Sequence, residues 1–187
     1  MGFFDDLVKK SNEETAPSQT SENKAERITF SRLPADLEGF KALPEADMST
    51  PFKTAALTVL ALNYFSSDKE LCHSMLDFIK GPKPLTPYEK QFINDRFMDG
   101  KDYIPRSYFS GATPQNDYEP AEPLSVVVSE NPYSYDDENY AKLYLTSGGA
   151  DSPRQVTLRL AKDGKWYLWE QFLLSGIREP ESSDPWA

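Results

Sequence analysis

The sequence predicts a single α+β domain, in which three or four N-terminal helices pack on a C-terminal four-stranded antiparallel meander. Two observations support this fold class. From residue 28 to residue 100, apolar residues recur at helical spacing between proline and glycine boundaries. From residue 124 to residue 172, four short segments are rich in β-branched and aromatic residues and partly alternate. Helices followed by consecutive strands are typical of an α+β domain with the helices on one sheet face.

The central helix is the best defined element of the helical half. Thr50 is a good N-cap and Pro51 suits the first helical position. The residues from 52 to 65 are nearly all apolar, which indicates a helix covered by neighbours on most sides. A weaker helix is expected before it, at residues 35–42.

Two more helices are expected after the central one. The first has Ser66 or Ser67 as its N-cap, with Glu70 placed for a capping box with Ser67, and ends at Gly81. The second begins at Thr86 and ends by Gly100. An ordered, aromatic-rich loop is expected over residues 101–123.

The strand half is divided by clear turn signals. Asp163-Gly164 is a strong hairpin signal between the last two strands. In the second strand Ala141, Leu143 and Leu145 alternate with polar or aromatic residues, which predicts one buried face. The four expected strands cover residues 124–129, 140–146, 155–160 and 165–172.

The N-terminal residues are predicted to lie outside the domain. Residues 1–10 are predicted to form a short amphipathic helix with Phe3, Phe4, Leu7 and Val8 on one face. This face predicts docking on a partner protein or, weakly, on a membrane surface, and the alternative is that it folds back on its own domain or frays. Residues 11–27 are predicted to be a flexible polar linker, which leaves residues 28–187 as the domain.

Composition excludes several classes of function. With 30 acidic and 20 basic residues the net charge is -10, so nucleic acid is not an expected partner. No apolar run approaches the roughly 20 residues of a transmembrane helix. One cysteine and one histidine exclude a disulfide and multi-histidine or multi-cysteine metal sites, and we expect no cofactor. The unpaired cysteine and the lack of a signal-like N-terminus predict a cytoplasmic protein.

No residue is predicted to be catalytic or to bind a metal. Cys72 and His73 are adjacent in a helix and point about 100° apart, so they cannot act as a nucleophile and base pair. We expect Cys72 to be a small buried hydrophobe and His73 to be a surface or cap residue. The glycine-containing segment 147–154 is read as a hairpin connection held by an ion pair between Asp151 and Arg154.

A ligand site is an alternative reading of the aromatic residues. Arg154, Arg159 and Glu170 would supply its polar groups, although Glu170 is also a natural cross-strand partner for Arg159. Trp186 is expected to pack in a groove on the domain. The candidate aromatic lining residues, which could equally be core, are Tyr108, Tyr118, Trp166 and Trp169.

Several stretches together resemble a family of bacterial domains of unknown function, found mainly in Gram-positive anaerobes. The resemblance covers residues 28–187 and implies a domain boundary, but no activity, substrate, cofactor or site residue. The order of helices and strands also resembles cone-shaped domains of the nuclear-transport-factor type, which implies a pocket between sheet and helices. The matching stretches are residues 49–52 and 54–57, 81–82 and 84–85, 111–114 with Asn116 and Tyr118, 148–154, Arg159, 166–170 and 184–186.

The sequence thus supports two functional hypotheses. The first is a non-enzymatic protein-interaction module with a tethered N-terminal docking helix. The alternative is a small-molecule-binding domain or an enzyme with an aromatic-lined pocket between sheet and helices.

Overall fold

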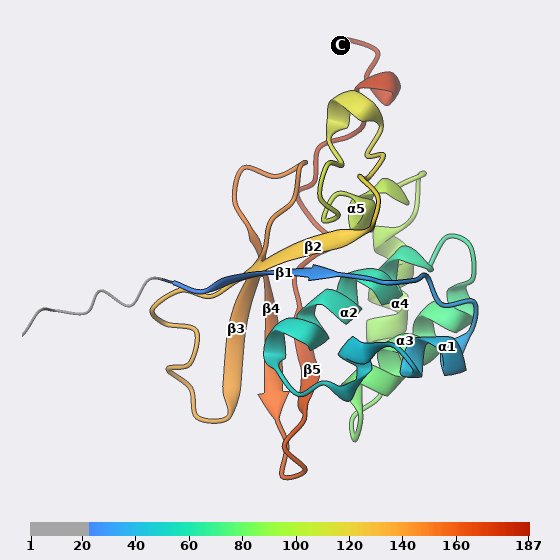
Figure 1. The fold of residues 1–187 in the computed structure, drawn as a ribbon. Helices are drawn as coiled ribbons and strands as arrows, with labels where there is room; N and C mark the ends of the chain where they lie inside the picture. Colours follow the sequence, from blue (N-terminus) through green and yellow to red (C-terminus); the bar gives the residue numbers. More distant parts are fainter. Residues whose placement is uncertain (1–22) are drawn as a thin grey trace, which may run out of the picture.

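The predicted α+β architecture is confirmed in the computed structural model, which describes residues 23–187 (Figure 1). The helices lie together on one side of an antiparallel sheet whose strands follow chain order, β1 to β5. The elements are β1 (Ala25–Thr29), α1 (Leu37–Lys41), η1 (Pro44–Asp47), α2 (Pro51–Asn63), α3 (Lys69–Lys80), α4 (Pro87–Arg96), α5 (Tyr103–Arg106), η2 (Pro114–Asn116), β2 (Ser125–Ser129), β3 (Tyr140–Leu145), β4 (Arg154–Leu160), β5 (Trp166–Gln171) and η3 (Glu181–Ser183).

Strand β1 is an addition to the predicted meander. It pairs with β2 from Ala25 opposite Ser129 to Thr29 opposite Ser125. The strand therefore begins inside the stretch assigned to the linker, and the sheet starts before residue 28. Strand β2 meets β3 at only two positions, so β1 and β2 lie across the direction of β3–β5 in Figure 1. The predicted amphipathic helix and most of the linker fall outside the described residues.

The predicted helix boundaries are confirmed where local capping chemistry is strong. The Thr50 hydroxyl accepts a hydrogen bond from the Lys53 N–H, and Thr86 forms a capping box with Glu89. The cap of α3 was predicted wrongly: Asp68 accepts from the Leu71 N–H at 2.9 Å, in place of Ser66 or Ser67. A carboxylate one residue later competes well for the same N-terminal amides.

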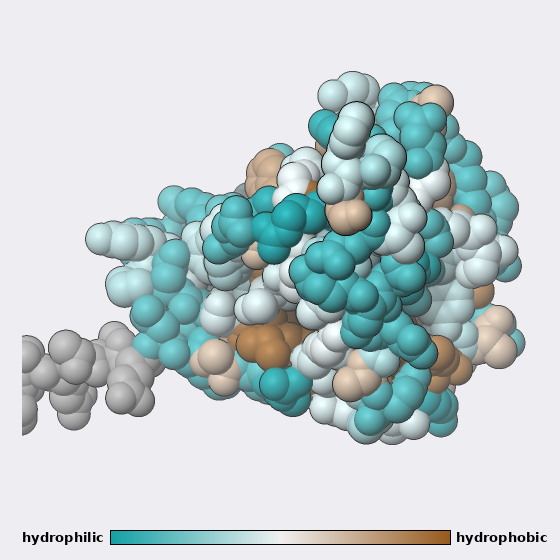
Figure 2. Space-filling view, turned by 90° about the horizontal axis from the view of Figure 1, so that it is seen from above, coloured by the Kyte–Doolittle hydropathy of each residue, from teal (hydrophilic) through white to brown (hydrophobic). Residues whose placement is uncertain are grey.

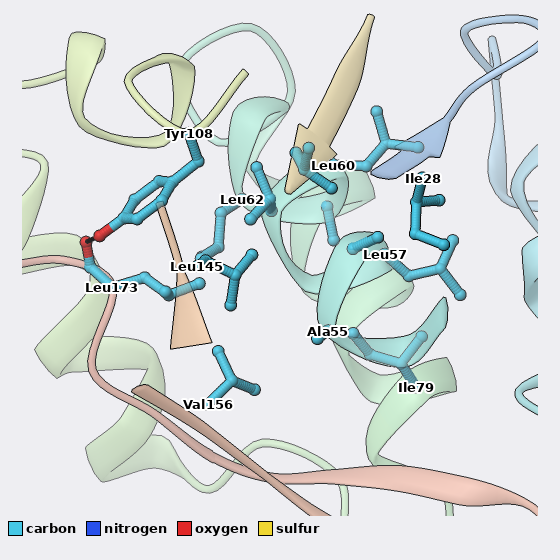
Figure 3. Close-up of a cluster of buried hydrophobic side chains, with 14 of the residues drawn as sticks. Ile28, Ala55, Leu57, Leu60, Leu62, Ile79, Tyr108, Leu145, Val156 and Leu173 are labelled. Atoms are coloured by element: carbon cyan, nitrogen blue, oxygen red, sulfur yellow. Dashed lines mark hydrogen bonds between the residues drawn. The ribbon is translucent and has the colours of Figure 1, made fainter. Parts of the chain in front are cut away.

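Helix α2 is the centre of the hydrophobic core, as its all-round apolar character predicts. Leu57 and Leu60 are fully buried between the other helices and the inner face of the sheet (Figure 3). That inner face carries Ala141, Leu143 and Leu145, all fully buried, as the alternation in β3 predicts. The space between α2 and the sheet is therefore filled with side chains.

The outer face of the sheet carries no helix within residues 23–187. Tyr140, Lys142 and Tyr144 point to this face and are partly exposed. The view from the end where the C-terminus emerges shows a mostly hydrophilic surface with small hydrophobic patches (Figure 2). Trp186 near this end is 93% exposed, so the prediction that it packs in a groove on its own domain is wrong. No helix in the described part of the chain is long and apolar enough to cross a membrane.

His73 differs from its expected place at the surface, because α3 turns it toward the core. Its side chain is 6% exposed, and its Nε2 atom has no hydrogen-bond partner among the described residues. Burial lowers the pKa of His73 below 6.5, and the charge of Lys90 and, less strongly, of Lys69 lowers it further, against Glu70 and Asp77.

This environment predicts a pH-dependent stability. The folded state disfavours the imidazolium, so the unfolded chain binds more protons once the pH falls below 6.5. We expect the free energy of unfolding to fall as the pH is lowered from about 7 to about 5, and this slope to flatten in His73→Phe. Urea unfolding at both pH values tests it. If the free energy of unfolding of His73→Phe fell with pH as steeply as that of the unaltered chain, carboxylates and not His73 would be responsible for the pH dependence.

Candidate functional site

All but one of the predicted ligand residues separate into two groups in the structure. The first group binds the segment that follows β5 through hydrogen bonds, and it consists of Tyr108, Tyr118 and Arg154. The Tyr108 hydroxyl donates to the Leu173 carbonyl at 2.6 Å, as Figure 3 shows. The Tyr118 hydroxyl donates to the Arg178 carbonyl at 2.5 Å. Their polar groups are satisfied internally, which fits a structural role.

Arg154, the first residue of β4, and Asp151, in the loop before it, also hold the segment that follows β5. Arg154 donates to the carbonyls of Ser175 (3.1 Å) and Gly176 (2.7 Å). The expected ion pair of Asp151 with Arg154 is wrong: Asp151 pairs instead with Arg178 at 2.6 Å. The Arg154 side chain points away from Asp151 because it donates to carbonyl oxygens of the segment that follows β5.

Arg159 and Trp169 lie together on the outer face, beside the α3–α4 loop. The Arg159 guanidinium is 4.5 Å from the ring centre of Tyr140. Trp169 packs edge-to-face on the same Tyr140 ring, with 5.5 Å between ring centres. Lys83 of the loop lies 4.8 Å above the Trp169 ring. Each cation therefore lies over an aromatic face, which is a favourable arrangement.

A β-bulge explains the position of Trp169. Leu168 pairs with Leu158 and Glu170 pairs with Thr157, so Trp169 is the extra residue of β5. Bulges redirect side chains, often beside functional sites. Glu170 consequently faces Thr157 rather than Arg159, and the predicted pair of Glu170 with Arg159 is wrong. Trp166, at the start of β5, packs instead on Tyr135 and lies apart from this cluster.

The α3–α4 loop is held firmly against this cluster. Lys80, at the end of α3, pairs with Glu89 of α4 at 2.9 Å, and the Lys80 side chain is only 7% exposed. Asp77 accepts a hydrogen bond from the Leu85 N–H at 2.8 Å. Burial alone would raise the pKa of Glu89, but the Thr86 N–H and the Lys80 ammonium together hold it below its ordinary value.

These elements enclose a cavity of about 800 Å³ between the α3–α4 loop and the outer face of β4 and β5, called here the basic groove. Its volume lies within the range of ligand sites. Among residues 23–187, Glu89 is the one acidic residue that lines it, in a chain with ten more acids than bases. Its basic and aromatic lining residues are Lys80, Lys83, Arg159 and Lys162, with Tyr140, Tyr167 and Trp169.

Comparison with known families decides the identity of the chain. The model of a domain of unknown function, DUF6935, matches residues 32–181. The chain belongs to the DUF6935 family. The expected resemblance to a family of unknown function is thereby confirmed, over slightly narrower bounds than residues 28–187. No curated protein and no solved structure matched the chain.

The outer face of the DUF6935 domain continues from the basic groove into a region of opposite charge. This second cavity, of about 520 Å³, shares Tyr140 and Trp169 with the basic groove. We call it the acidic patch, after its carboxylates Asp136, Asp137, Glu138 and Glu170. In the part of the chain that the structure describes, Lys142 is the one basic residue of its lining, and it pairs with Asp137 at 2.6 Å.

A smaller apolar cavity lies on the other side of the Lys80–Glu89 pair. It measures about 290 Å³ and lies between α3, α4 and β5. Phe92 and Phe172 contribute aromatic surface to it, and Phe172 is partly exposed. The domain thus places basic, acidic and apolar surfaces next to one another around β5.

The cysteine of the DUF6935 domain is unreactive at neutral pH. Cys72 is buried, and burial together with the Asp68 charge raises the pKa of its thiol to about 12, so it stays protonated at neutral pH. No group of three or more His, Cys, Asp or Glu within residues 23–187 is placed to hold a metal ion.

Sequence reasoning found Arg159, Trp169 and Glu170 but missed the lysines of the basic groove. One local signal was available for Lys83, because Pro82 and Pro84 flank it and hold that stretch extended. Tyr140 and Lys162 carry no local signal, since only the strand register brings them to the groove.

Proposed function

We propose that the DUF6935 domain is a non-enzymatic interaction module, and that it captures an acidic, partly apolar peptide of a partner protein in the basic groove. The observation that carries this proposal is the local reversal of charge. Four cations and three aromatic rings line one groove of a chain whose net charge is -10. Such a groove attracts acidic segments while the rest of the surface repels them.

The state of the polar groups favours binding over catalysis. Lys80 and Glu89 neutralise each other, and Lys83 and Arg159 lie over aromatic rings. A catalytic site needs a nucleophile or base that is free to take a proton. Among the described residues the one cysteine is buried and protonated, and the one histidine faces the core.

The extent of the surface favours a peptide over a small ligand. The basic groove and the acidic patch form one continuous strip over β3, β4 and β5, joined at Tyr140 and Trp169. An extended peptide can contact alternating charges and rings along such a strip.

Fluorescence anisotropy with a labelled glutamate-rich peptide containing one tryptophan tests this function on the full chain. We expect binding that weakens as salt is added. Lys83→Glu combined with Arg159→Glu is expected to weaken it by about tenfold or more, about 1.4 kcal/mol. Arg96→Glu combined with Lys101→Glu makes the same charge change outside the groove and should reduce binding much less.

Two outcomes would reject this function. Equal loss in both double variants would indicate attraction by overall charge alone. Displacement of the peptide by inorganic phosphate, with no contribution from the peptide's tryptophan, would favour the small-molecule alternative.

A further inference from the structure

The strip formed by the basic groove and the acidic patch has a polarity that one segment of this chain matches. We propose that residues 2–10 bind along this strip in cis, with Asp5 and Asp6 at the basic groove and Lys9 and Lys10 at the acidic patch. The inference rests on the proposed function, because the segment is itself an acidic, partly apolar peptide that would compete with a partner for the same groove.

The charge pattern supports the match. The cations Lys83, Arg159 and Lys162 of the basic groove lie at one end of the strip. The carboxylates of Asp136, Glu138 and Glu170 line the adjoining acidic patch, and Glu138 lies next to the junction, where its carbonyl accepts from Arg159 at 3.4 Å. Residues 2–10 carry two acids followed by two lysines, which is the complementary order.

The direction of approach agrees with this order. Strand β1 begins at Ala25, which pairs with Ser129 of β2. Ser129 pairs in turn with Tyr144 of β3, and Tyr144 pairs with Gln155 of β4. Gln155 lines the acidic patch, whereas Arg159, farther along β4, lines the basic groove. A chain that leaves β1 therefore meets the acidic patch first. Lys10 and Lys9 also come first when the segment is followed outward from β1.

The apolar residues of the segment have suitable contacts at the groove. Leu7 and Val8 lie between the two acids and the two lysines, so they would reach the Trp169 and Tyr140 rings at the junction of the two cavities. Trp169 is 39% exposed, so its ring is available for such contacts. Phe3 and Phe4 precede the two acids and would lie farther along, at the Tyr167 ring of the basic groove. Aromatic pairs of this kind add to the free energy of simple burial.

The connecting chain is long enough. Four strand spacings separate β1 from β5, roughly 19 Å across the sheet. The polar composition of residues 11–22 predicts a flexible span with a root-mean-square length of about 19 Å. When the length of a tether matches the distance that it must span, the effective concentration of the tethered segment at its site is in the millimolar range. A weak contact between residues 2–10 and the strip is then populated.

Paramagnetic NMR on the full chain tests the placement. Cys72 is buried, so a nitroxide reagent labels the Gly2→Cys variant at residue 2 alone. We expect strong broadening of the Trp169 indole N–H and the Lys83 amide, and none at Asn116 in η2, which lines neither cavity. Adding Asp5→Lys with Asp6→Lys should abolish the broadening. Glu13→Lys with Glu14→Lys, the same charge change in the linker, should leave it intact.

The results that would overturn the inference are distinct. Absence of broadening, or equal loss in the two charge variants, rejects docking of this segment. Broadening that appears only when labelled and isotope-enriched molecules are mixed assigns the contact to a second copy and rejects docking in cis.

The failure of this inference can be told apart from failure of the proposed function. Docking in cis predicts that Asp5→Lys with Asp6→Lys strengthens binding of the glutamate-rich test peptide, because the groove is released. A test peptide that binds the unaltered chain and this variant equally overturns the inference and leaves the function standing. A test peptide that binds neither rejects the function itself.

Discussion

Replacing Gly148 with alanine is expected to destabilise the domain by about 3 kcal/mol or more, which corresponds to a fall in Tm of roughly 6–12 °C. Gly148 lies between β3 and β4, and its N–H donates to the Ser107 carbonyl at 2.9 Å. A Cβ at this position would fall on the Ala112 carbonyl oxygen, which is backbone and cannot rotate away. The backbone itself would have to move.

A matched glycine separates this steric effect from conformational strain. Gly100 has a φ of +73° and nothing within 4 Å of its Cβ position. Gly100→Ala should therefore cost only the left-handed strain, about 1–2 kcal/mol. Urea and thermal unfolding followed by circular dichroism compare the two variants. If Gly148→Ala proved no more costly than Gly100→Ala, the close contact with Ala112 would be refuted.

The Gly148 contact also shows how far sequence reasoning can go at such a loop. The glycines of residues 147–154 were expected to shape a hairpin connection. The group that approaches them is the chain itself: Ala112 faces Gly148, and the Tyr118 hydroxyl faces Gly149. A glycine in a sequence signals close approach but carries no information about the group that approaches.

The predicted elements were correct where their determinants are local. Thr50 and Thr86 begin their helices, and the Asp163-Gly164 hairpin joins β4 and β5 with a φ of +83° at Gly164. Strand β1 was missed because its pattern is nearly all polar, with Ile28 its one buried residue. Its pairing partner, β2, lies about a hundred residues away along the chain, and neither strand encodes that separation.

The candidate site was only partly predictable for the same reason. Aromatic side chains in strands were recognised, but the bulge that turns Trp169 outward depends on the register of β4 and β5. Tyr108 and Tyr118 are aromatic residues like Trp169, and nothing in their local sequence separates them from it. They are buried because the segment after β5 packs over them. Burial on one side of a sheet or the other is a tertiary property.

Removing the carboxylate of Glu89 is the second change expected to have a large effect. Glu89→Ala leaves the Lys80 ammonium, on a side chain 7% exposed, with only the Trp169 carbonyl at 3.5 Å. Stranding a buried charge costs about 3–5 kcal/mol, and we expect about 2–3 kcal/mol here because Glu89 is 36% exposed. Lys80→Met should cost less, since water and the Thr86 N–H still solvate Glu89.

Two controls isolate the ion pair. Thr86→Ala removes only the hydroxyl half of the capping box, keeps the backbone N–H that donates to Glu89, and should cost about 1 kcal/mol. The double variant Lys80→Met with Glu89→Ala should be more stable than Glu89→Ala, because no stranded charge remains. Urea unfolding at neutral pH gives all four values. A double variant less stable than Glu89→Ala would show that Lys80 stabilises the domain by packing and not through its partner.

The pH dependence provides an independent measure of the same pair. The pKa of Glu89 is lower in the folded domain than its ordinary value of 4.5, so the unfolded chain binds the proton more readily. The stabilisation is complete above that value and is lost as the pH falls through the folded pKa. In acid, Glu89→Ala should therefore lose less stability than the unaltered domain. Because Lys80 lines both the basic groove and the apolar cavity, loss of the pair in the same acid range should also loosen the groove.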